Sequence, residues 1–196
     1  MMHYGILFLL TLATLSLASA LTFKDYSLLA DIKQSAEQTK VTLMQISLRN
    51  IIELTDSIIN TKAINLQVMP ELHAIRQRAV TKLQNERSLN ESDIETVLED
   101  LRKIIGTDEL DDEAVNARLS QYTNGSYITT FEKTLQQVNR EIQIFVYRTN
   151  PKIRQLSAAA QQSEQRVISA FNNVAYAGLV RIEKSFSDFL ELIEQN

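Results

Sequence analysis

Apolar residues recur at steps of three, four or seven positions from Asp25 to about Asn60. An α-helix has 3.6 residues per turn, so this spacing places the apolar side chains on one face of a helix. The stripe consists of Leu29, Ile32, Ala36, Leu43, Ser47, Ile51, Leu54 and Ile58. The 196 residues include only four glycines and two prolines, whereas a β-rich fold needs turn residues every ~8–12 positions. The pattern therefore predicts an all-α protein with one long helix near its start.

Local start and stop signals divide the rest of the chain into five further amphipathic helices. Pro70 suits the first turn of a helix, where its missing N–H would have no helical partner. Ser92-Asp93-Ile94-Glu95 has the pattern of a capping box, and Gly106 suits the left-handed position that ends a helix. The expected ranges are 70–87, 92–105, 111–119, 126–150 and, if unbroken, 152–194. Long first and last helices predict an elongated antiparallel helical bundle of about five to six helices.

The first twenty residues have the features of a secretory signal peptide. Gly5 to Leu17 form an uncharged, largely apolar run of 13 residues, which is too short to cross ~30 Å of hydrocarbon. Ala18-Ser19-Ala20 follows with the small side chains of a cleavage site. We therefore expect residues 1–20 to be a signal peptide, with a buried N-terminal helix as the alternative. Residues 21–196 are then a single all-helical domain that is secreted and extracellular, with no transmembrane segment after cleavage.

Two further features concern export. Asn90-Glu91-Ser92 and Asn124-Gly125-Ser126 are sequons for N-linked glycosylation, and both lie in expected loops. Asn90 and Asn124 are therefore the glycosylation candidates. The chain contains no cysteine, so its stability depends on its core rather than on disulfides, and thiolate metal ligands are excluded.

The residues that catalysis or cofactor binding would need are sparse. Beyond the signal peptide the chain has one histidine, His73, and no G-x-S-x-G motif frames a nucleophile for it. No glycine-rich loop is present to bind phosphate. The acids from Asp108 to Glu113 lack the spacing of a calcium-binding EF-hand loop, and capping of a helix explains them without a metal. We therefore expect no enzymatic activity, no cofactor and no metal. The formal charge of −4 does not favour a nucleic-acid partner.

The segment Val174-Ala175-Tyr176-Ala177-Gly178-Leu179-Val180 is apolar on all sides of a helix. A helix of this kind is buried on more than one side, in the core, at a subunit contact or against a ligand. Packing in the core is the favoured interpretation. The residues that would instead contact an apolar ligand or a partner are Phe171, Val174, Tyr176, Gly178, Leu179 and Ile182.

Two functions are consistent with these observations. The first is a secreted, non-catalytic helical-bundle protein that acts by binding another macromolecule, an unknown protein partner. The alternative is an extracellular carrier of lipid or another apolar small molecule. In general character the chain is similar to the exchangeable insect apolipophorins, which are exported, lack cysteine and consist of about five amphipathic helices. The likeness covers composition and helix count, and it implies the carrier function. Homo-oligomerisation through the long helices fits either function, because such stripes also pair between chains.

Overall fold

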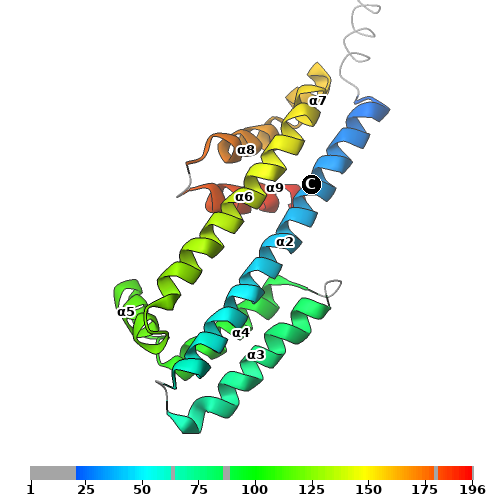
Figure 1. Cartoon of the computed structure of the whole chain (residues 1–196). Coiled ribbons are helices and arrows are strands. Elements are labelled where there is room, and N and C mark those ends of the chain that lie inside the picture. Colours follow the sequence, from blue (N-terminus) through cyan, green and yellow to red (C-terminus); the bar gives the residue numbers. More distant parts are fainter. Residues whose placement is uncertain (1–20, 63–64, 86–88, 179–180, 196) are drawn as a thin grey trace, which may run out of the picture. The chain divides into compact units, whose positions relative to one another are not determined.

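A computed structural model describes residues 21–62, 65–85, 89–178 and 181–195. Over these ranges the chain forms eight α-helices and no strand, so the all-α prediction is confirmed (Figure 1). The expected signal peptide, residues 1–20, lies outside the described residues. The helices are α2 (Phe23–Thr61), α3 (Met69–Gln84), α4 (Glu91–Ile105), α5 (Asp112–Tyr122), α6 (Ser126–Arg154), α7 (Ala158–Ser163), α8 (Gln165–Tyr176) and α9 (Ile182–Gln195), with a 3-10 turn, η1 (Leu66–Val68).

The chain divides into two compact units, each described by itself. One unit combines Met1–Gln38 with Ile142–Asn196, and the other is Thr39–Glu141. The boundary falls within α2 and within α6, so each of these helices contributes residues to both units. We call them the terminal unit and the central unit.

Helix ends in the central unit follow local chemistry. Pro70 lies in the first turn of α3, as expected. Gly106 ends α4 with φ 64°, and the backbone N–H of Thr107 donates to the Arg102 carbonyl at 2.8 Å. The start of α4 differs from the prediction, because Asn90 rather than Ser92 caps it. The Asn90 side chain accepts the Asp93 N–H at 2.8 Å. A capping residue must lie just outside the helix, and Ser92 lies within it.

The core of the central unit lies between the second half of α2 and the helices α3, α4 and α5. Its buried members are spaced by three, four or seven residues along α2, α3 and α4. They are Met44, Leu48, Ile51, Ile58, Leu72, Ile75, Ala79, Ile94, Val97, Leu101, Ile105 and Leu119. Ion pairs flank this core, with Arg78 and Asp100 at 2.8 Å and Lys82 and Asp93 at 2.7 Å. Acids of α4 thus pair with cations of α3.

The final segment forms three helices, and the expectation of one long helix over 152–194 is corrected. α6 does not end at Pro151 but continues to Arg154. Pro151 removes the amide partner of the Tyr147 carbonyl, and the Tyr147 side chain is exposed, so water can reach this part of the helix. Ser157 then caps α7, Glu164 separates α7 from α8, and Ala177 is extended after α8.

Four phenylalanines fill the core of the terminal unit. Phe145 comes from α6, Phe171 from α8, and Phe186 and Phe189 from α9, and all four are buried. The ring centroid of Phe145 lies 6.0 Å from that of Phe171, 5.2 Å from Phe186 and 5.5 Å from Phe189. Edge-to-face and tilted pairs at these separations contribute about 0.5–1.5 kcal/mol each beyond burial. The cluster therefore joins α6, α8 and α9, which are separated in the sequence by α7 and by the breaks before and after α7 and after α8.

Removal of one ring tests how much the phenylalanine cluster contributes to the free energy of unfolding. We expect Phe189→Ala to lower the free energy of unfolding by about 3–5 kcal/mol, since it leaves a cavity among three other rings. Tyr147→Ala, on the exposed face of α6, should change it by less than about 0.5 kcal/mol. Urea unfolding followed by circular dichroism measures both. Equal effects of the two substitutions would contradict the assignment of the rings to the core.

The carboxylate of Asp25 connects two distant segments of the terminal unit. Thr22 and Asp25 form a reciprocal capping box, in which the Asp25 N–H donates to the Thr22 hydroxyl and Asp25 Oδ2 accepts the Thr22 N–H at 2.8 Å. Asp25 Oδ1 also accepts the Ser157 N–H at 2.8 Å, and Oδ2 accepts the Ser157 hydroxyl at 2.9 Å. These donors, with the Ser157 N–H foremost, hold the pKa of Asp25 well below its ordinary value of 3.8.

This lowered pKa predicts acid sensitivity. A carboxylate whose pKa is lowered by folding stabilises the folded state above its ordinary pKa, and this stabilisation is lost as the pH falls below that value. We expect Asp25→Asn to lower the melting temperature at pH 7 and to flatten its decline between pH 5 and pH 2. Asp188→Asn, at an exposed pair with Lys184, is the matched control and should leave the decline unchanged. Parallel pH profiles for Asp25→Asn and the unchanged protein would refute this role.

Candidate functional site

Of the six residues expected to contact an apolar ligand or a partner, the five that the structure describes differ in exposure. Phe171, Val174 and Ile182 are buried, and Phe171 belongs to the phenylalanine cluster. Tyr176, in contrast, is 86% exposed. Gly178 is exposed in the link between α8 and α9, and Leu179 lies outside the described residues. The described positions are thus partly packed core and partly solvent-facing.

A different apolar surface lies on α6 within the central unit. Ile128, Phe131 and Leu135 are 53%, 48% and 40% exposed. Their spacing of i, i+3 and i+7 aligns them along one face of the helix, and we call them the α6 stripe. The sequence places Phe131 and Leu135 on the same face as Val138 and Ile142, which are both buried. The sequence pattern therefore predicts which residues share this face. It does not predict that Val138 is buried whereas Leu135 is exposed.

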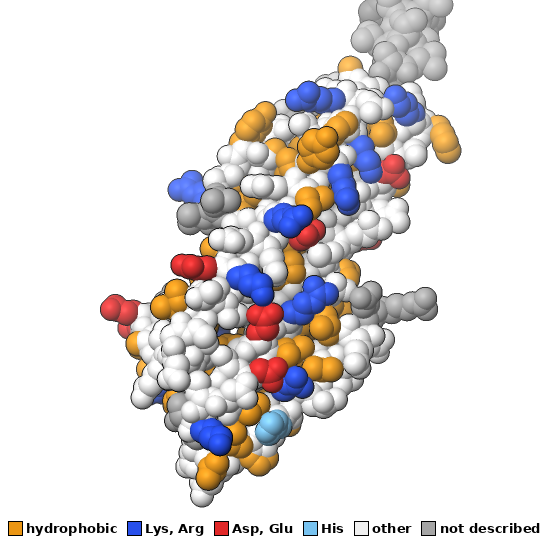
Figure 2. Space-filling view, viewed as in Figure 1, with side chains coloured by type: hydrophobic (Ala, Val, Ile, Leu, Met, Phe, Trp, Pro, Cys, Tyr) orange, Lys and Arg blue, Asp and Glu red, His pale blue; other side chains and the backbone are white. Residues whose placement is uncertain are grey.

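The α6 stripe rests on an ordered base. The ring of Phe131 lies 5.9 Å from that of Tyr127, and Tyr127 packs against the core of the central unit. A large apolar side chain that is already held in place loses less conformational entropy on binding. Phe131, at the centre of the stripe, thus has a neighbour that itself packs on the core. Figure 2 shows apolar side chains and charges of both signs interspersed on the face that it draws.

An apolar groove of about 270 Å³ lies in the terminal unit. Leu29 and Ile32 of α2, Val167 of α8 and Ile193 of α9 line it. Lys33 also lines it, and its amino group donates to the Ile193 carbonyl at 3.2 Å. The groove has the apolar lining of a small-ligand site but falls just below the volume of about 300–1,000 Å³ that is usual for one. Leu29 and Ile32 belong to the apolar stripe that the sequence predicts for the first helix.

Both glycosylation candidates are exposed. Asn90 caps α4 through its oxygen, which leaves its amide nitrogen without a role in the cap. Asn124 lies between α5 and α6 with φ 51°, in the left-handed region that asparagine tolerates better than most residues. The hydroxyl of Ser126 in the same sequon lies 2.7 Å from that of Ser57.

Of the residues considered for catalysis or metal binding, Asp111 has a structural role and His73 lies on the surface. His73 is exposed on α3. Asp111 caps α5 by accepting the Ala114 N–H at 2.9 Å, which is the capping role expected for this acidic run. Among the described residues, no group of three histidines or carboxylates is placed to hold a metal ion. No helix in the described ranges has the length and apolar character needed to span a membrane.

No known protein family, curated protein or solved structure matches this chain. The case for a function therefore rests on the residues and their arrangement.

Proposed function

We propose that this chain is a secreted, non-catalytic binding protein that recognises a protein partner through the α6 stripe. The observation that carries the proposal is the row of three half-exposed large apolar side chains, Ile128, Phe131 and Leu135. Anchors at i, i+3 and i+7 are the pattern by which a helix enters an apolar groove of another protein. Glu132, which is exposed four residues after Ile128 and three before Leu135, supplies part of the polar rim that surrounds such anchors.

The size of the stripe supports a hot spot rather than a whole interface. Full burial of an isoleucine, leucine or phenylalanine side chain is worth about 1.5–3 kcal/mol. With about half of each side chain already covered, complete burial of the three contributes about 2–4 kcal/mol. That range is near the free energy of a millimolar complex. A specific partner must therefore add polar contacts around the stripe, as interface rims do.

Site-specific photocrosslinking tests the proposal. Phe131 is replaced by p-benzoylphenylalanine, and the protein is irradiated in the fluid into which its source cells export it. We expect a discrete adduct with one protein, because this ring lies at the centre of the stripe. Leu135→Glu in the same chain should abolish the adduct, since a carboxylate cannot be buried in an apolar groove at little cost.

The matched control places the photoreactive residue at Gln136, which is exposed on a different face of α6. An adduct of equal yield at positions 131 and 136, or none at 131, would overturn the proposal. Leu135→Glu is a surface change and should leave the melting temperature nearly unchanged. This control separates loss of binding from loss of folding.

A second candidate function is the carriage of an apolar ligand, which the groove of the terminal unit supports. The groove offers Leu29, Ile32, Val167 and Ile193 to such a ligand. Its volume of about 270 Å³ suits a small molecule or part of one acyl chain. The phenylalanine cluster speaks against a larger internal site in this packed state, because its rings occupy the core.

Intact-mass spectrometry of the exported protein separates these alternatives and tests export. We expect an N-terminus at Leu21, glycan mass on the sequons of Asn90 and Asn124, and no retained lipid. Ser92→Ala removes the first sequon and keeps the Asn90 cap, and Asn124→Asp removes the second with a residue that tolerates the same φ. Each should remove one glycan. A retained N-terminal segment would contradict export by this route, and a lipid mass would make carriage the leading function.

A further inference from the structure

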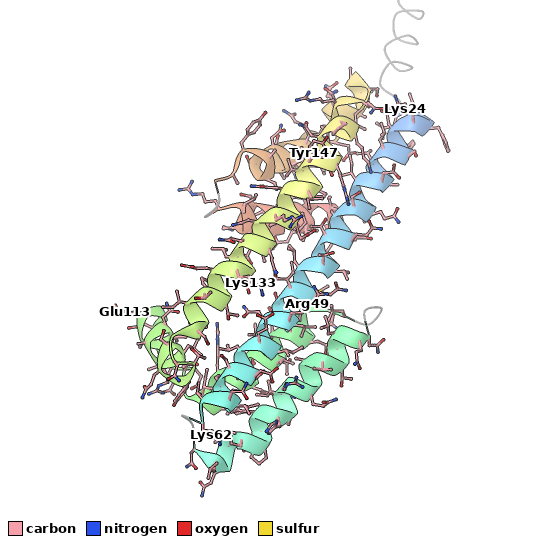
Figure 3. All side chains as sticks on the ribbon, in the orientation of Figure 1. Lys24, Arg49, Lys62, Glu113, Lys133 and Tyr147 are labelled. Atoms are coloured by element: carbon pink, nitrogen blue, oxygen red, sulfur yellow. The ribbon has the colours of Figure 1, made fainter. Side chains whose placement is uncertain are left out.

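A polar cleft of about 250 Å³ lies between α2 and α6 within the central unit. Three cations line it, Arg49 from α2 and Lys133 and Arg140 from α6, together with the carboxylates of Glu53 and Glu141. Figure 3 labels Arg49 on α2 and Lys133 on the neighbouring α6. The α6 residues of the cleft lie on the face opposite the stripe, because about 100° of rotation separates successive helical residues. The cleft is therefore independent of the surface proposed above.

The cations of the cleft are not equally engaged. Lys133 lies 3.9 Å from Glu53, a long and exposed ion pair that contributes little. Among the described residues, neither Arg49 nor Arg140 has a hydrogen bond or ion pair from its guanidinium. Two guanidinium groups at one cleft provide planar forks of N–H donors, which match a carboxylate better than a lysine ammonium does. The cleft thus holds donor capacity for an anion.

The two carboxylates limit the kind of anion. The lining side chains sum to a charge of about +1, from three cations and two carboxylates, so a polyanion is poorly matched. Glu141 has no ion pair among the described residues and offers acceptors to a hydroxyl or ammonium. Asn50 lines the same cleft, and its buried amide oxygen has no hydrogen-bond partner in the described part of the chain. The cleft therefore offers hydrogen-bond donors to an anion, and it offers the acceptors of Glu141 and Asn50 to hydrogen-bond donors of a ligand.

We propose that this cleft binds a small hydroxy- or amino-carboxylate. Arg49 and Arg140 hold the ligand carboxylate, and Glu141 accepts a hydrogen bond from its hydroxyl or ammonium group. The volume of about 250 Å³ equals about eight water molecules at ~30 Å³ each, which is room for a ligand of this size. The binding requires no metal and no covalent step.

Isothermal titration calorimetry with malate and glutamate, at low ionic strength, tests the site in the exported chain. We expect saturable binding of at least one probe, weakened by about tenfold or more in Arg49→Gln and in Arg140→Gln, because each loses a charge-assisted pair. Arg49→Lys keeps the charge but loses the fork, and it should also weaken binding. Arg148→Gln, at an exposed arginine of α6 outside the cleft, is the matched control and should bind as the unchanged protein does.

Inorganic sulfate distinguishes a built site from general surface charge. We expect sulfate to bind more weakly than the better organic probe, since it brings no donor for Glu141, and Glu141→Gln should narrow this difference. Equal affinity for sulfate and both organic probes would overturn the assignment of the ligand class. Absence of saturation with both probes, or equal binding by Arg49→Gln and Arg148→Gln, would overturn the site. All these residues are on the surface, and melting curves confirm that the variants fold.

Discussion

The packing of Phe145 against Phe171, Phe186 and Phe189 is the constraint on which the terminal unit depends. The chain has no cysteine, so no disulfide holds α6, α8 and α9 together. The short helices α8 and α9, which follow breaks, gain little stability from their own backbone hydrogen bonds. The rings supply the buried area that makes these helices part of one core. Phe171, one of the residues expected to contact a ligand or a partner, is part of this packed core.

The sequence predicts most helix ends in the central unit because their causes are local. Pro70, Gly106 and Asp111 each act within a few residues of their own position. The sequence does not predict the break at Ser157, because its stabilising partner, Asp25, lies 132 positions away. Thr22 and Asp25 have the spacing of a capping box, but the apolar stripe alone places the helix start at Asp25. The presence of α-helices was therefore predictable from the sequence, whereas the break between α6 and α7 depends on a distant contact.

The candidate surfaces were less predictable than the fold. Periodicity showed that Phe131 and Val138 share a face of α6, but only the packing of neighbouring helices decides that one is exposed and the other buried. The polar cleft required the relative register of α2 and α6, which sets Arg49 near Arg140 although they are distant in sequence. Neither arginine belongs to a motif. Two residues that come to line one cleft only in the folded chain leave no signal in a single sequence.

The bonds of Asp25 also make the fold depend on how the chain is trimmed. Two of the four donors to this carboxylate belong to Thr22, the second residue after the expected cleavage point. A protease that cut two residues further along would remove both and leave the charge with Ser157 alone. Precise processing at one end of the chain would then decide whether the junction of α6 and α7, near the other end, stays anchored. Ragged N-termini in a purified sample would accordingly be mixtures of differently stable molecules.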